Sequence, residues 1–135
     1  IRRKDISLME IGSSTSLMPE LSLLDNIKYF LFNDNIDENM ITNVLNKYEL
    51  ESFKSDLVGD FSSGMLKRSE IAIAELKNPK VLCIDEPRVY LDENGVELLL
   101  NLITKREKEG STSILSSQES IGAFTSIERS FNLND

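Results

Sequence analysis

Val81-Leu82-Cys83-Ile84-Asp85-Glu86-Pro87 is the stretch that decides the fold. Four consecutive apolar residues run directly into two carboxylates and a proline. A short apolar run of this kind is typical of a strand buried on both faces of a parallel sheet, and open α/β sheets bind their ligands at the carboxyl ends of such strands. The sequence therefore predicts a buried parallel strand that carries Asp85 and Glu86 to the ligand-binding edge.

Helix start signals occur at four places. At each place a residue that can cap a helix precedes apolar residues at helical spacing, which predicts a capped helix there. These capping residues are Ser22, Asp37, Ser62 or Ser63, and Asp92. The third of these helices is expected to stop at Asn78-Pro79, and the fourth at Gly110. In the helix after Asp37, the side chains expected to face inward are Met40, Ile41, Val44 and Leu45.

Strands are expected on both sides of these helices. The predicted strands, besides Val81–Ile84, are Ile6–Ile11, Ser113–Ser116 and Ile127–Leu133, with a short helix over Ser120–Phe124. Strand, helix and strand in succession predict a parallel sheet, and the helices between the first two strands form an insertion. This is half of an α/β nucleotide-binding architecture.

The composition excludes several classes of function. The 135 residues suffice for one domain, and a net charge of −8 without a basic run argues against nucleic-acid binding. No apolar run approaches the roughly 20 residues of a membrane-spanning helix. The chain has no histidine, which removes the usual general base, and its one cysteine, Cys83, is expected to be a small buried apolar residue rather than a disulfide or metal ligand.

Three motifs in order carry a family resemblance. Phe61–Met65 before a helix, then Val81–Pro87, then Leu91-Asp92 resemble the signature motif, Walker B and D-loop of the ATP-binding subunits of ABC transporters. The resemblance implies an α/β fold of the P-loop NTPase class, with a parallel sheet and a helical subdomain and with the first strands and the P-loop absent. It implies one domain over 1–135, with the Q-loop region and helical subdomain at about 13–77 and the Walker B, D-loop and C-terminal strands at 78–135.

The segment 11–30 narrows the resemblance. It is similar to the Q-loop region of the haem-exporter ATP-binding subunit used in cytochrome c maturation. This implies haem export in cytochrome c biogenesis, membrane transporter subunits as partners, and a place peripheral to a membrane on the cytoplasmic or mitochondrial matrix side.

The departures from the family pattern concern nucleotide binding. The P-loop sequence G-x-x-x-x-G-K-S/T, whose glycines let backbone amides approach phosphate, does not occur. The Q-loop glutamine position falls on Ser14, with Ser13 as the alternative, and the switch-histidine position falls on Gln118. The signature is altered at three positions: Phe61, Ser63 and Met65.

Asp85 and Glu86 keep their family positions. The resemblance implies that Asp85 holds Mg²⁺ through water and that Glu86 is the catalytic residue that polarises the attacking water. The plainer interpretation is that Asp85 ties the strand end to a neighbouring loop and that Glu86 faces solvent.

The other site residues also have two interpretations. Ser62 and Gly64 suit an ATP phosphate at a helix N-terminus, in the family the ATP of the opposite subunit, but Ser62 is equally an ordinary cap. Asp92 is either a D-loop residue or a plain N-cap. Arg68 is either an anion ligand or part of a solvated helix face.

Because the sequence contains no P-loop motif, three functional hypotheses arise. The first is the C-terminal part of an ABC transporter subunit that binds ATP and Mg²⁺ only when a polypeptide carrying the P-loop half completes it; that polypeptide is expected to cover an open apolar edge of the Val81 strand. The second is a pseudo-ATPase kept as a structural or assembly subunit of a larger membrane complex, with no cofactor. A third is a chain that lends Ser62–Gly64 to a partner's ATP. None of them is an autonomous ATPase.

Overall fold

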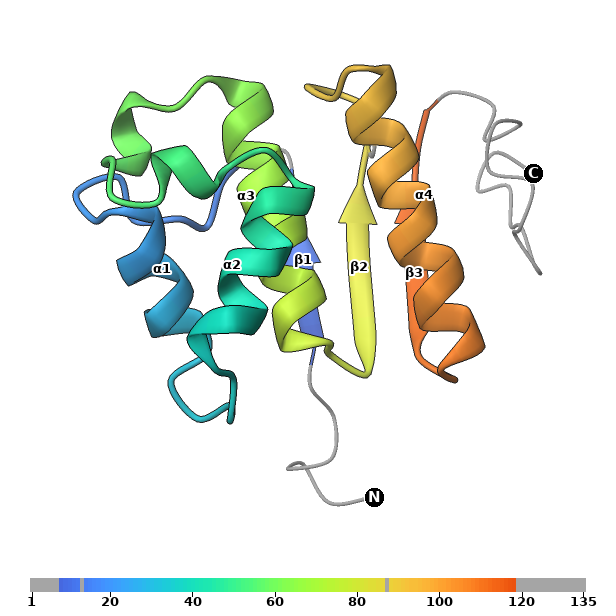
Figure 1. Cartoon of the computed structure of the whole chain (residues 1–135). Helices are drawn as coiled ribbons and strands as arrows, with labels where there is room; N and C mark the ends of the chain where they lie inside the picture. The colour runs from blue at the N-terminus through green and yellow to red at the C-terminus, as the bar shows by residue number, and fades with distance from the viewer. Residues whose placement is uncertain (1–7, 13, 87, 119–135) are drawn as a thin grey trace, which may run out of the picture.

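The computed structural model of the chain describes residues 8–12, 14–86 and 88–118. In front of the sheet, as Figure 1 shows, lie α3 and α4, while α1 and α2 lie beside α3. The expected helix at 120–124 and strand at 127–133 fall outside the described residues. The described elements run in the order β1 (Leu8–Ile11), α1 (Leu23–Phe30), α2 (Glu38–Lys47), the 3-10 helices η2 (Glu51–Phe53) and η3 (Val58–Asp60), α3 (Ser63–Lys77), β2 (Val81–Asp85), α4 (Glu93–Lys108) and β3 (Thr112–Ser116).

Strand β2 is the central strand of the parallel sheet. It pairs with β1 on one side and with β3 on the other, so that Leu82 lies opposite both Met9 and Ser113. The expectation of an open apolar flank beside Val81–Ile84 is therefore wrong. An apolar run indicates that a strand is buried, but it does not specify which strands pair with it. The open edges of the described sheet belong to β1 and β3.

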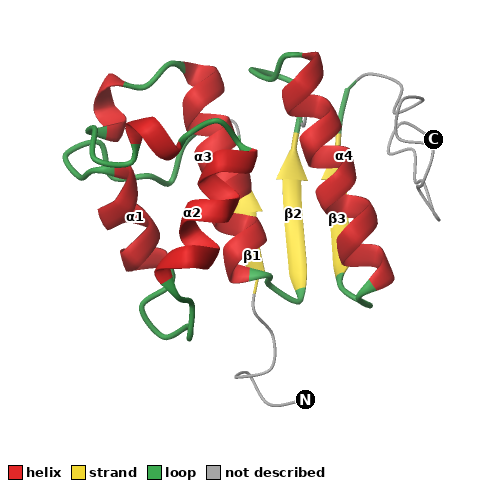
Figure 2. Ribbon diagram, in the orientation of Figure 1, coloured by secondary structure: helices red, strands yellow, loops and turns green. Residues whose placement is uncertain are grey.

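The helices cover one face of this sheet (Figure 2). Leu82 and Ile84 of β2 alternate toward that face and are buried there. On the other face Cys83 is only half-buried and Ile114 of β3 is 54% exposed. The expectation that Cys83 is buried is wrong, because the helices of the described residues cover only the opposite face of the strand. The core between sheet and helices includes Ile71, Ile73, Leu76, Leu99 and Leu102.

The local start signals of the helices are confirmed. Ser22 Oγ accepts a hydrogen bond from the backbone N–H of Asp25 at 3.1 Å, and an Asp37 carboxylate oxygen accepts one from Met40 at 2.8 Å. One expectation for α2 is wrong: Ile41 is buried, but Met40 is 48% exposed. Consecutive helical residues point about 100° apart, which places Met40 outside the buried stripe. No helix in the described part of the chain has the length and apolar character needed to cross a bilayer.

Arg106 of α4 fixes the connection between α3 and β2. The residue is 1% exposed, and its guanidinium donates to the carbonyl oxygens of Pro79 at 2.8 Å and Thr112 at 3.1 Å. It also donates to the side chains of Asn78 and Ser113, each at 3.1 Å. Burial lowers the pKa of Arg106. Through Arg106 of α4, these bonds join the end of α3 to the start of β3.

Candidate functional site

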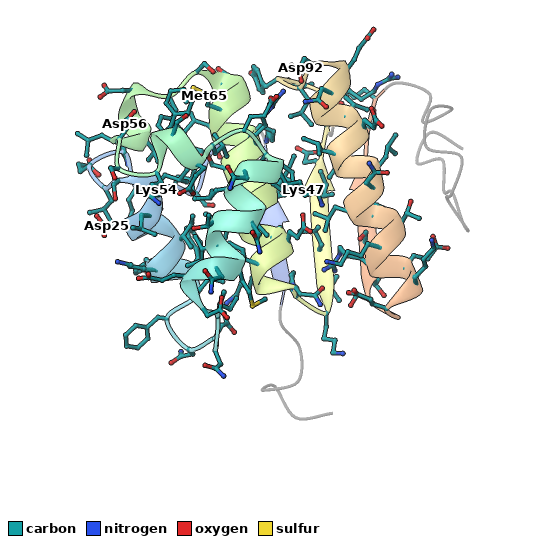
Figure 3. All side chains as sticks on the ribbon, viewed as in Figure 1. Asp25, Lys47, Lys54, Asp56, Met65 and Asp92 are labelled. Atoms are coloured by element: carbon teal, nitrogen blue, oxygen red, sulfur yellow. The ribbon has the colours of Figure 1, made fainter. Side chains whose placement is uncertain are left out.

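The sequence-predicted site residues gather at one end of the molecule. The carboxyl ends of the strands and the amino ends of α3 and α4 lie at this end (Figure 1). Figure 3 shows Met65, in the first turn of α3, and Asp92, before α4, at the same end. The arrangement follows from parallel strands whose connecting helices return antiparallel to them.

The two carboxylates at the end of β2 contact the end of β3 and the residues that follow it. An Asp85 carboxylate oxygen accepts a hydrogen bond from Ser116 Oγ. Glu86 Oε1 accepts from the backbone N–H of Gln118 at 2.9 Å, and Oε2 from Ser117 Oγ at 3.4 Å. The plainer interpretation of Asp85 as a tie to a neighbouring loop is wrong in its partner, because Ser116 is the last residue of the neighbouring strand β3. The plainer interpretation of Glu86 as solvent-facing is wrong, because this carboxylate is half-buried and bonded.

The backbone of the turn after β2 is strained. Glu86 has φ 48° and Tyr90 has φ 69°, a left-handed conformation that costs a non-glycine residue about 1–2 kcal/mol. The backbone N–H of Glu86 donates to the Ser116 carbonyl at 2.9 Å, and the Glu86 carbonyl accepts from the Val89 N–H at 3.0 Å. These two bonds hold the conformation of Glu86. Such outliers gather at functional sites, so this turn is a candidate site on backbone grounds alone.

The signature segment forms the capped start of α3. Ser62 is the N-cap, and its Oγ accepts from the Met65 backbone N–H at 3.2 Å. A Cβ on Gly64 would lie 3.3 Å from the Tyr90 carbonyl oxygen, so the signature and the turn before α4 are close neighbours. The capping role of Ser62 is thus present in the structure, while the contact of Ser62 and Gly64 with an anion stays a prediction.

Arg68 joins the signature helix to the start of α4. Its Nη2 lies 2.9 Å from both carboxylate oxygens of Asp92, and its Nη1 donates to Glu49. Its side chain is 14% exposed, so the interpretation of Arg68 as a solvated face is wrong. Because Arg68 and Asp92 are 24 residues apart, no local pattern reveals the pair.

These contacts shift the pKa values of both groups. Burial by itself lowers the pKa of Arg68. The hydrogen bonds to Glu49 and Asp92 raise this pKa by more than burial lowers it, so the net shift is upward. The pKa of Asp92 is lowered by the hydrogen bond from the Gly95 backbone and by Arg68. Asp92 is the N-cap of α4, accepting from Gly95 at 2.8 Å, so the cap interpretation holds and the D-loop role stays a prediction.

The site is divided into two groups. Among the described residues, no hydrogen bond or ion pair joins the pair Asp85 and Glu86 to the group of Ser62, Gly64 and Asp92. The described part of the chain also has no cluster of three or more metal-binding side chains. Asp85 is nevertheless a hard oxygen ligand of the kind Mg²⁺ takes from protein, the remaining ligands being waters and phosphate oxygens. Binding of magnesium by Asp85 stays a prediction.

A comparison with known families identifies the architecture. The family model described as ABC transporter matches residues 1–89. The chain belongs to the ABC transporter family. It is 33% identical over 119 residues to the uncharacterized ABC transporter ATP-binding protein YybJ of Bacillus subtilis, covering 84% of this chain and 55% of that protein. It is 36% identical over 113 residues to the lantibiotic transport ATP-binding protein SrtF of Streptococcus pyogenes, covering 82% and 49%.

The predicted ABC ATPase fold is confirmed. A solved structure of the ATP-binding subunit of an ABC transporter superimposes with a TM-score of 0.73 at 22% identity, over 83% of this chain and 49% of that one. The cytochrome c biogenesis ATP-binding export protein CcmA of Shewanella frigidimarina is 29% identical over 112 residues, covering 83% and 52%. The ABC transporter proteins similar to this chain thus serve different substrates, and the chain spans about half their length.

Proposed function

We propose that this chain is the C-terminal part of an ABC transporter ATP-binding subunit whose phosphate-binding loop comes from a second polypeptide. One observation carries the proposal: an ABC transporter sequence places Asp85, Glu86 and the start of α3 at one end of the fold, yet contains no G-x-x-x-x-G-K-S/T segment. That loop binds nucleotide phosphates through its backbone amides and lysine. The chain alone is therefore not expected to hydrolyse ATP.

Each site residue has an expected role in the completed unit. Asp85 holds Mg²⁺ through water, and Glu86 orients and polarises the water that attacks the terminal phosphate. Ser62 and Gly64 place the amino end of a 15-residue helix against a phosphate, where backbone N–H groups and the helix dipole favour negative charge. Asp92 keeps the D-loop at the signature through Arg68.

The second polypeptide is expected against the uncovered side of the sheet. An open cavity of about 280 Å³ lies there, lined by Cys83, Ile84, Asp85, Ile114 and Ser116. Strand β3 has a free edge beside it in the described sheet. An unpaired strand edge next to an exposed apolar side chain such as Ile114 favours association with another polypeptide. The cavity includes Asp85, so an occupant would contribute directly to the site.

The relatives support a proposal for the partners and the substrate. We infer membrane transporter subunits as partners and a peripheral place at a membrane, on the cytoplasmic or mitochondrial matrix side. We propose that the complete transporter exports haem in cytochrome c biogenesis. The CcmA protein among the relatives and the 11–30 segment support this substrate. Haem accumulation or loss of c-type cytochromes after deletion supports it, and an unchanged cytochrome c content contradicts it.

A pseudo-ATPase in a larger membrane complex is the second candidate. Two observations favour it: Ser14 and Gln118 stand at the expected Q-loop and switch positions, and both carboxylates already accept hydrogen bonds from the end of β3 and the residues after it. In that case the strand end is a structural joint, and nucleotide does not bind there.

Isolation of the native assembly separates the two candidates. We expect affinity purification through this chain, with mass spectrometry, to recover a companion that carries a phosphate loop, and the assembly to hydrolyse MgATP. Glu86→Gln should abolish hydrolysis but keep ATP bound, whereas Glu93→Gln, an exposed acid at the start of α4, should leave hydrolysis unchanged. An assembly without such a companion and without bound nucleotide would overturn the proposal in favour of the pseudo-ATPase.

A further inference from the structure

Helix α3 contains a buried ion pair that the nucleotide site does not use. Lys67 is 6% exposed and Glu70 is 2% exposed. The Lys67 ammonium lies 3.5 Å from the Glu70 carboxylate, three residues along the same helix. Opposite charges at this spacing usually lie on a solvated face and stabilise a helix only slightly. Here both charges are withdrawn from water, so other hydrogen bonds have to offset the loss of hydration.

Those hydrogen bonds go to the segment that follows β1. Lys67 Nζ donates to the carbonyl oxygen of Gly12. Glu70 Oε1 accepts from the backbone N–H of Ser16 at 3.2 Å, across 54 residues of sequence. The two contacts lie on either side of Ser14, the Q-loop position. The pair therefore binds this segment to the signature helix through one acceptor and one donor of its backbone.

An ion pair is not needed for burial at this place. Replacing a buried pair by apolar residues of similar size is often neutral or stabilising. The residues next to the pair along α3, including Ile71 and Ala72, already pack in the apolar core. What the charges add is direction, since each fixes one backbone group of the loop at a defined distance from the helix.

We propose that Lys67 and Glu70 are positioning residues that fasten the segment around Ser14 to α3, so that this segment and the signature helix move as one unit. The proposal rests on the proposed function for its consequence: a shift of either element on nucleotide binding is transmitted directly to the other. Its structural core, the tether itself, is tested without nucleotide.

Amide hydrogen exchange of Ser16 in the full chain measures the tether. The matched variants are Lys67→Met/Glu70→Gln and Lys67→Met/Glu70→Leu, which both remove the ion pair and leave no lone buried charge. Only the glutamine variant keeps an oxygen that accepts from Ser16. We expect Ser16 to exchange roughly tenfold faster in the leucine variant than in the glutamine variant.

The core amide of Leu99 in α4 serves as the internal reference, because a general loss of stability raises both rates. The result is therefore read as the ratio of Ser16 to Leu99 exchange. A ratio that is higher in the leucine variant than in the glutamine variant supports the tether. An equal ratio in both variants overturns it. Failure of the native assembly to bind nucleotide would contradict the proposed function but leave this measurement valid.

Discussion

At the scale of single residues, Glu75 on α3 contacts two lysines and a tyrosine hydroxyl. Its side chain is 9% exposed and accepts from Lys47 Nζ at 2.8 Å and from the Tyr48 hydroxyl at 2.7 Å, and Lys105 of α4 lies 3.5 Å away. Burial alone raises the pKa of Glu75, but the hydrogen bonds from Lys47 and Tyr48 lower it more, so the net shift is downward. Burial and the same carboxylate raise the pKa of Tyr48.

This shift gives stability a defined pH dependence. Because the pKa of Glu75 is lower in the folded than in the unfolded chain, its stabilisation is complete above the unfolded value of about 4.3 and is lost as the pH falls through the folded value. We expect Glu75→Gln to lower the free energy of unfolding at pH 7 by about 1–3 kcal/mol. The difference from wild type should shrink below about pH 4. Urea unfolding across pH 3–7 measures this, with the exposed Glu97→Gln as control; a pH-independent difference would contradict it.

At the scale of elements, Arg106 links α4 to the turn after α3 and to β3. Removing its side chain leaves the carbonyl oxygens of Pro79 and Thr112 without this donor in a buried place. We expect Arg106→Met to lower the free energy of unfolding by about 2–4 kcal/mol, since each unsatisfied buried group costs about 1–3 kcal/mol. Lys108→Met, on the exposed side of the same helix, should change it little. Equal effects of the two substitutions in chemical denaturation would show that the Arg106 bonds do not stabilise the fold.

The signature end of α3 gives a second prediction at this scale. A Cβ on Gly64 meets the Tyr90 carbonyl oxygen at 3.3 Å, so a branched side chain has to displace the turn before α4. We expect Gly64→Val to lower ATP hydrolysis by the native assembly about tenfold or more, since a displacement near 1 Å can cost that much. Gly64→Ala should have a smaller effect. Unchanged hydrolysis in the valine variant, with the protein folded, would exclude a role of this surface in the partner's site.

The contrast between elements and pairings shows how far the sequence predicts this fold. The helix starts at Ser22, Asp37, Ser62 and Asp92 were predictable, because a cap depends on residues within one turn of it. The central position of β2 was not, because strand order depends on contacts between segments more than 60 residues apart, such as Met9 with Leu82.

The same limit applies to the candidate site. Asp85 and Glu86 were found because an apolar run leads directly into them. Their contacts with Ser116 and Gln118, and the pairing of Arg68 with Asp92, depend on how distant segments fold together, and no pattern in the sequence indicates them.

At the scale of the whole molecule, the described helices cover one side of the sheet and leave Ile114 exposed on the other. Ile114 lies on that uncovered face and is 54% exposed. If the proposed companion packs there, Ile114→Asp places a charge in the interface, and we expect recovery of the companion with this chain to fall roughly tenfold or more. Phe32→Asp is the matched control, because Phe32 is also apolar and is 84% exposed, but lies between α1 and α2. Quantitative mass spectrometry of the purified assemblies compares the two, and circular dichroism confirms that both variants fold. Equal recovery from the two variants would place the companion on a different surface, because an unpaired charge buried in an interface weakens binding.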